Sequence, residues 1–189
     1  VRSTGGKNAY RTLVVQGPDT DIEKTNKLML TLPTDKVANR MMMEVHYYTP
    51  YQFTLMDKDA DWGKMFYYWG ANNRSTTDME RNPTWGEEAD LAKLFKSMKT
   101  QFVDKGIPVI LGEFGAIRRS NLSGSNLTLH LASRAYYLKV VVQQAKANGM
   151  VPFYWDEGNL GSNGFGIFNR FNTSVADTQA LNGLLEGLN

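Results

Sequence analysis

The sequence predicts an α/β fold in which four consecutive β-α units form one parallel sheet. Two observations support this class. Short apolar runs alternate along the chain with longer segments of helical periodicity, and two of the helical segments end at a glycine, Gly106 and Gly149. Alternation of this kind favours parallel strands joined by right-handed crossover connections.

The predicted strands are short runs rich in β-branched, aromatic or methionine residues, as buried strands of a parallel sheet are. They are Thr12–Gln16, Met41–His46, Pro108–Glu113 and Val151–Trp155. The first and the last of these runs are expected to form the two edges of the sheet.

Each predicted strand is followed by a predicted helix. The second helix shows the pattern most clearly, because its apolar residues recur with the 3.6-residue period of an amphipathic helix. That apolar face consists of Leu91, Leu94, Phe95, Met98 and Phe102. The four predicted helices span Asp21–Thr31, Glu87–Lys105, Leu131–Asn148 and Asp177–Leu188.

The composition indicates one globular domain and gives no sign of a nucleic-acid or membrane partner. The 21 basic and 19 acidic residues leave a formal charge of +2, which is too balanced for a nucleic-acid surface. The absence of cysteine excludes disulfides and thiolate metal sites, and 2 histidines exclude a histidine-rich metal site. No apolar run approaches the roughly 20 residues that span a bilayer, and the opening VRSTGGKNAY lacks a signal-peptide pattern.

Two long connections follow predicted strands. Tyr48–Gly86 contains Trp62, Trp69 and Trp85, whereas Phe114–His130 is rich in Asn, Ser and Gly. Both connections leave the carboxyl ends of strands, where parallel α/β folds place their sites. The tryptophans exceed what a core needs, so we expect some to line a cleft and at least one to anchor the loop.

The apolar run VILGEFG at 109–115 contains a carboxylate between two glycines. Strand alternation predicts that Glu113 shares a face with Val109 and Leu111. Burying a carboxylate there costs several kcal/mol unless the group is paired or functional, and the flanking glycines suit the close approach of a ligand. We therefore expect Glu113 to be functional; the alternative is a strand-end glutamate in a structural salt bridge.

A second polar group lies near the end of the run Met41–His46, where alternation places Glu44, His46 and Tyr48 on one face. Histidine and tyrosine can bond sugar hydroxyls or orient a carboxylate. The alternative is a structural role, which is the commoner one for a lone histidine at a strand end. The other histidine, His130, is expected to begin a helix and to have no functional role.

Trp155, in FYWDEG at 153–158, ends the last predicted strand. Its ring is either part of the core or a platform, since aromatic faces suit the C–H-rich faces of pyranose rings. The chain has no Gly-x-Ser-x-Gly motif and no phosphate loop. The glycine-rich GSNGFG at 161–166 is a weak nucleotide signal because it follows a Trp-Asp-Glu turn.

Taken together, three of these motifs resemble glycoside hydrolase family 5, and most closely its bacterial endoglucanase and xyloglucanase branch. They are HYYTPYQF at 46–53, GIPVILGEFGA at 106–116 and FYWDEG at 153–158, in the family's order, and FGIFNR at 165–170 also fits. The resemblance covers essentially the whole chain. It implies a single domain, residues 1–189, that forms strands five to eight, the C-terminal half, of a TIM (β/α)8 barrel.

The resemblance also implies a function, that of a retaining endo-β-1,4-glucanase that hydrolyses β-glucan polysaccharides. On this pattern Glu113 is the nucleophile, His46 and Tyr48 surround the cleaved sugar, and Trp155 is the sugar platform. The expected contacts with substrate are His46, Tyr48, Trp62, Trp85 and Trp155. The reaction needs two carboxyl groups and water, so no cofactor or metal is expected, and the family implies a secreted or extracellular protein.

One element of the family pattern is missing from the sequence. The family's general acid/base is the glutamate of an Asn-Glu-Pro motif, which these 189 residues do not contain. A retaining mechanism needs two carboxyl groups about 5–5.5 Å apart, so either an N-terminal half is missing or the chain assembles with another. The alternatives to an active enzyme are a non-catalytic carbohydrate-binding module and a structural half-barrel that self-assembles.

Four strands cannot close a barrel, because closure requires a matched strand number and shear. Unpaired edges at 12–16 and 151–155, together with an apolar inner face, predict self-association, most simply as a twofold homodimer. In a dimer that completes eight strands, Asp156 or Glu157 of one copy would lie near the vacant acid position of the other. Glu157 is therefore a candidate stand-in acid, and its alternative role is that of an ordinary turn carboxylate.

Overall fold

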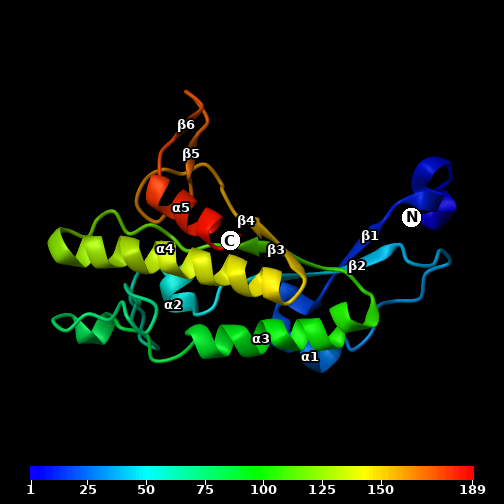
Figure 1. Cartoon of the computed structure of the whole chain (residues 1–189), viewed down its shortest axis with the longest axis horizontal. Coiled ribbons are helices and arrows are strands. Elements are labelled where there is room, and N and C mark those ends of the chain that lie inside the picture. Colours follow the sequence, from blue (N-terminus) through cyan, green and yellow to red (C-terminus); the bar gives the residue numbers. More distant parts are fainter.

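The computed structural model describes residues 1–189, and its centre is a parallel sheet with the strand order β1-β2-β3-β4 (Figure 1). The strands are β1 (Leu13–Gln16), β2 (Met41–Tyr47), β3 (Val109–Phe114) and β4 (Met150–Tyr154). Every neighbouring pair is parallel. The predicted parallel sheet is confirmed, and so is the prediction that its first and last strands are the edges.

Helices and one small hairpin accompany the sheet. The α-helices are α1 (Ile22–Leu28), α2 (Tyr51–Thr54), α3 (Glu88–Gln101), α4 (Gly124–Ala147) and α5 (Thr178–Glu186). The hairpin pairs β5 (Phe168–Asn169) with β6 (Ser174–Val175). Single 3₁₀ turns lie at Arg2–Thr4, Gly6–Tyr10, Pro18–Thr20, Met79–Arg81 and Val103–Lys105. No helix combines the length and the apolar character that crossing a membrane requires.

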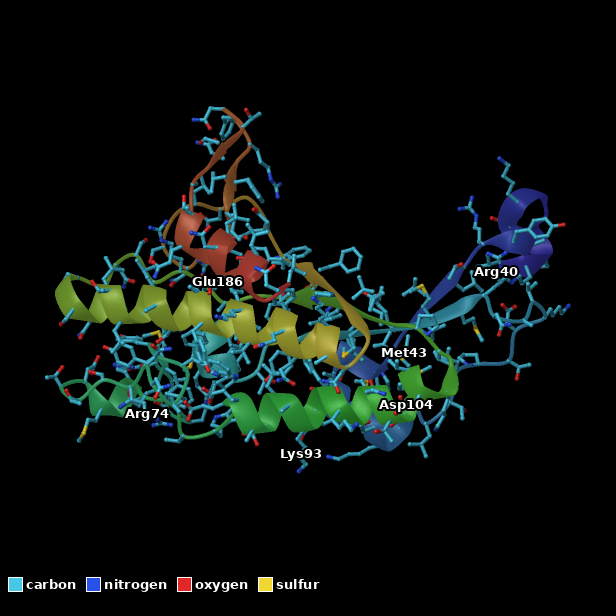
Figure 2. All side chains as sticks on the ribbon, viewed as in Figure 1. Arg40, Met43, Arg74, Lys93, Asp104 and Glu186 are labelled. Carbon is cyan, nitrogen blue, oxygen red and sulfur yellow. The ribbon has the colours of Figure 1, made fainter.

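One hydrophobic core lies between the sheet and the helices α1, α3 and α4. Met43 of β2, labelled in Figure 2, is fully buried in this core. Helix α3 buries the predicted apolar face, whereas its Lys93 points outward into solvent (Figure 2). The buried members of that face are Leu91, Phe95, Met98 and Phe102, with Leu94 packed at its border. Gly106 then ends the segment in the left-handed conformation, with φ 78°, as a helix-terminating glycine does.

Several predicted helix boundaries are wrong. Helix α4 begins at Gly124 rather than at Leu131. Its first turns contain only two apolar side chains, Leu127 and Leu129, and no buried residue before His130, so they show no apolar period. His130 therefore lies inside α4 instead of at its start, and it is fully buried. Helix α1 ends at Leu28 and not at Thr31, and α3 and α5 also end a few residues earlier than predicted.

The face of the sheet that points away from the core is open. Paired residues of parallel strands share a face, and one row across this face contains Gln16, Glu44, Ile110 and Val151. Val14, Val151 and Phe153 are 46%, 53% and 52% exposed. The sheet thus presents apolar side chains and two unpaired edges, β1 and β4, to its surroundings.

Candidate active site

An irregularity in β3 decides where Glu113 points. Val45 of β2 pairs with Leu111. The next residue of β2, His46, pairs with Glu113, which leaves Gly112 as an extra residue in β3. The pairing of β3 with β4 shifts at the same place. Such a β-bulge interrupts the alternation of side chains and re-aims those beyond it.

The predicted face of Glu113 is wrong for this reason. Val109 and Leu111 are buried in the core, whereas Glu113 lies beyond the bulge and contacts His46 on the open face. Simple alternation cannot register an extra residue in a strand. The sequence does hold one sign of it, because a glycine inside a strand often marks a bulge.

The carboxylate of Glu113 lies next to two side chains from the end of β2, one of which donates a hydrogen bond to it. The hydroxyl of Tyr48 donates a hydrogen bond of 3.0 Å to Oε2 of Glu113, and Nδ1 of His46 lies 3.6 Å from the same oxygen. Burial, together with the charge of Glu113 beside it, raises the pKa of Tyr48. Tyr48 therefore keeps its proton and acts as a donor, which stabilises the charged form of a carboxylate.

Glu44 belongs to the same group of polar side chains and lies two residues before His46 in β2. Its Oε1 lies 3.0 Å from Nε2 of His46, which confirms that the two residues share a face. The carboxylate of Glu44 occupies the space beside the bulge: a Cβ added to Gly112 would lie 2.8 Å from Cδ of Glu44 and closer still to Oε1. The open face thus carries a connected series of polar groups from Glu44 through His46 to Glu113.

A cavity of about 460 Å³ lies next to these residues. Its walls come from the end of β2, from the turn that joins β1 to α1, and from the segment around Trp85 at the start of α3. The lining includes His46, Tyr48 and Trp85 together with the carboxylates of Asp19, Asp21, Glu23 and Asp90. Glu113 does not line this cavity itself, but His46 and Tyr48 both line it and contact Glu113.

The tryptophans divide into exposed and buried ones. Trp155 follows directly after β4 and is 44% exposed, and Trp62 is 66% exposed beside Tyr51 at a ring-centroid distance of 6.0 Å. Trp69, by contrast, is fully buried and donates from Nε1 to the carbonyl of Gly86 at 2.9 Å. Trp69 is therefore the expected loop anchor, whereas the exposed rings are free to meet a ligand.

The two long connections are joined by residues for which the sequence indicated no such role, among them His130. The guanidinium of Arg119 lies 5.5 Å from the ring centroid of Tyr67, and that of Arg81 lies 4.7 Å from it. His130 accepts the backbone N–H of Arg119 at Nε2 and contacts the carbonyl of Tyr67 through Nδ1. Burial lowers the pKa of His130 to about 3, so the neutral ring serves as one acceptor and one donor.

The carboxylates after β4 are engaged within their own loop. Both carboxylate oxygens of Glu157 accept the backbone N–H of Phe165, at 3.0 and 3.1 Å. Burial works to raise the pKa of Asp156, but hydrogen bonds from the N–H groups of Ile167 and Phe168 outweigh it and lower that pKa. Within one copy of the chain, both residues therefore act as acceptors that shape the loop.

Comparison with known proteins places the chain in a family. Residues 1–161 match the family model described as Cellulase (glycosyl hydrolase family 5). Endoglucanase A of Paenibacillus barcinonensis is 37% identical over 197 residues, which cover 100% of this chain and 46% of that protein. A xyloglucan-specific endo-β-1,4-glucanase of Bacteroides ovatus is 36% identical, over 100% of this chain and 35% of that protein.

Solved structures agree with the sequence relatives. A family 5 xyloglucan-specific β-1,4-glucanase from a ruminal metagenomic library, in complex with XXLG, superposes with a TM-score of 0.87 at 39% identity. The match covers 100% of this chain and 48% of that one, so the chain spans about half the length of the proteins it resembles. The chain therefore belongs to glycosyl hydrolase family 5 and forms half of that family's (β/α)8 barrel.

Proposed function

We propose that this chain supplies the nucleophile half of a retaining endo-β-1,4-glucanase, with Glu113 as the nucleophile. The observation that carries the proposal is the position of Glu113. It lies at the carboxyl end of β3, where barrels of this class place their active sites, and the bulge directs it to the inner face. The hydrogen bond from Tyr48 fixes the carboxylate there, and the ring of His46 lies beside it.

The proposed reaction proceeds in two displacements. An oxygen of Glu113 attacks the anomeric carbon, the glycosidic bond breaks, and the leaving oxygen takes a proton from a second carboxyl group. The now deprotonated second carboxylate then accepts a proton from water, which attacks the glycosyl-enzyme and releases Glu113. Both displacements invert the anomeric carbon, so the product retains the configuration of the substrate.

The proposed substrate is a polysaccharide with a β-1,4-glucan backbone, met outside the cell. The relatives that are named xyloglucan-specific act on such a backbone. The exposed rings of Trp62, Trp85 and Trp155 offer faces that suit pyranose rings. The acidic cavity beside His46 provides carboxylates that can accept hydrogen bonds from sugar hydroxyls.

The second carboxyl group is expected from outside this sheet. The edges β1 and β4 are unpaired and the apolar inner face is open, so we infer that the working unit contains either the N-terminal half-barrel or a second copy. In a dimer, Glu157 could serve as the acid only after giving up its hydrogen bond to the N–H of Phe165. Sedimentation as a stable monomer would reject the dimer, and carboxylates of Glu113 and the second copy's Glu157 more than about 10 Å apart would reject the borrowed acid.

The central experiment is turnover of a soluble β-glucan by the chain, alone and together with an N-terminal half-barrel. Glu113→Gln should abolish turnover, whereas the matched variant Glu186→Gln, on the exposed side of α5, should leave it unchanged. NMR of the first-formed product should show retained anomeric configuration. An inverted product would overturn the assignment of Glu113 as a nucleophile.

A second candidate function is binding of β-glucan without turnover. It is favoured by the exposed Trp155 beside the site and by the chain's spanning only about half of its relatives. Binding of a soluble β-glucan that is weakened by Trp155→Ala but unaffected by Glu113→Gln, in the absence of any turnover, would support this candidate over the enzyme.

A further inference from the structure

We infer that Glu44 is the positioning residue of the site, holding the ring of His46 so that its Nδ1 faces the carboxylate of Glu113. The inference rests on the proposed function in one respect only, namely that Glu113 is the group that needs to be positioned. Glu44 itself is not expected to touch substrate, because it lies two residues farther than His46 from the carboxyl end of β2, on the same open face.

The first support is the arrangement of the imidazole ring between two carboxylates. His46 has two ring nitrogens, and each faces a different carboxylate: Nε2 lies 3.0 Å from Glu44 Oε1 and Nδ1 lies 3.6 Å from Glu113 Oε2. The contact with Glu44 is the shorter one and has hydrogen-bond length. The ring is therefore anchored at Glu44, and its orientation toward Glu113 follows from that anchor.

The second support is that Glu44 has no other polar partner to account for it. Its neighbours across the sheet row are Gln16 and the apolar Ile110, with Val151 beyond. No lysine or arginine lies within salt-bridge distance of Glu44, and His46 is its one hydrogen-bonding partner. The side chain of Glu44 is 18% exposed, and most of its neighbours in the sheet row are apolar. Removing such a carboxylate from water is costly unless a hydrogen-bonding partner compensates for the lost hydration. The contact with His46 supplies that compensation.

The third support is the glycine that makes room for the carboxylate. Any side chain at Gly112 would collide with Glu44, since an added Cβ would lie 2.8 Å from its Cδ. Gly112 is also the extra residue of the bulge that turns Glu113 toward His46. One residue thus clears the space for Glu44 and directs Glu113 toward the same ring, which ties the two carboxylates together structurally.

The chemistry of the contact gives it a defined signature. An ionised carboxylate can only accept, so the proton between Glu44 and His46 belongs to Nε2. A partner that fixes one nitrogen of an imidazole determines what the other nitrogen presents, as the carboxylates that orient metal-binding histidines show. Loss of Glu44 should therefore release both the ring orientation and the location of its proton.

NMR of the full chain labelled with ¹⁵N-histidine and with ¹³C at the glutamate carboxyl carbons tests this directly. The chain contains only 2 histidines, so His46 and His130 give two sets of ring signals. We expect a protected Nε2–H for His46 in the unmodified chain and in Glu44→Gln, whose amide oxygen still accepts. In Glu44→Ala that signal should vanish, and the carboxyl signal of Glu113 should shift. Glu186→Ala, on the exposed side of α5, is the matched control and should change neither signal.

Unchanged His46 and Glu113 signals in a folded Glu44→Ala variant would overturn the inference, and so would a His46 ring that carries its proton only at Nδ1. The readout does not depend on turnover, which separates it from the proposed function: the expected spectra in a chain that never turns over substrate would leave the positioning intact and reject the activity. Where turnover is present, Glu44→Ala should lower kcat about tenfold at unchanged KM, the effect of a group that acts on the transition state alone, and Glu44→Gln should recover most of it.

Discussion

The hydroxyl of Tyr48 lies 3.0 Å from Oε2 of Glu113, and this hydrogen bond joins residues that are 65 positions apart in the chain. It links the end of β2 to the end of β3 at the point where the barrel interior opens. Two neighbouring strands thereby hold the proposed nucleophile, and neither strand alone could do so.

Replacing Tyr48 with phenylalanine should therefore slow formation of the glycosyl-enzyme. Hydrogen bonds to charged groups contribute about 1.5–3 kcal/mol, which corresponds to a loss of roughly tenfold or more in the first displacement. Pre-steady-state kinetics with an activated aryl β-glucoside measures this step in the assembled barrel. Tyr10→Phe, at the exposed N-terminal segment, is the control, and equal rates for the two variants would contradict the role of Tyr48.

Gly112→Ala should destabilise the chain by about 1–3 kcal/mol, the usual cost of forcing an extra methyl group into a packed site. The added Cβ would lie against Glu44, so the penalty should become smaller when Glu44→Ala is introduced as well. Chemical denaturation of the two single variants and the double variant gives the coupling energy. Strictly additive effects would show that the two residues do not compete for the same space.

Asp177→Asn should cost about 3–5 kcal/mol of stability, because it leaves the charge of Arg134 buried without its partner. The two side chains are 1% and 6% exposed, and their nearest atoms lie 2.5 Å apart. Asparagine can still accept the N–H of Ala180, as Asp177 does at the start of α5, so the variant removes the charge but keeps the cap. The exposed pair Lys139–Glu186 is the comparison, and Glu186→Gln should cost less than about 1 kcal/mol.

Stability should fall as the pH drops below 6.5, and His130 should be one cause. Its pKa is lowered by burial from 6.5 to about 3, so between these values the unfolded chain binds a proton that the folded chain does not. The unfolding free energy should then decrease by about 1.4 kcal/mol per pH unit over this window. In His130→Gln the slope between pH 6.5 and pH 4 should be smaller by about that amount. An identical slope in the variant would show that His130 does not titrate in this way.

The apolar runs of the sequence were sufficient to predict the four strands, because burial on the core side requires such runs wherever a parallel sheet is covered by helices. The proposed nucleophile was also recognisable, since a carboxylate between two glycines at a strand end is unusual. The face of the sheet to which Glu113 points was not predictable from strand alternation, because Gly112 is an extra residue that interrupts the alternation in β3. The sequence placed Glu44 on the face of His46, but it did not show that the two side chains are in contact or that Gly112 leaves room for the carboxylate of Glu44.

The polar loops were the least predictable part of the site. The hydrogen bonds that Asp156 and Glu157 accept from residues 165–168 join segments whose side chains show no pattern. The first turns of α4 are mostly polar and contain no buried residue before His130, so they resemble a loop in sequence. Contacts between single residues that lie far apart in the chain, such as His130 with Tyr67, produce no periodic pattern in the sequence.

The imidazole of His130 has a consequence for loop exchange between relatives. It forms hydrogen bonds with the carbonyl of Tyr67 in one connection and with the N–H of Arg119 in the other. The N–H of Ile117 also donates to the carbonyl of Thr54, which joins the same two connections. A chimaera in which only residues 48–86 come from a relative would therefore lack the residues of the second connection with which that segment forms hydrogen bonds. The two connections form one transplantable unit, and chimaeras that aim to alter specificity should carry residues 117–130 together with the tryptophan-bearing loop.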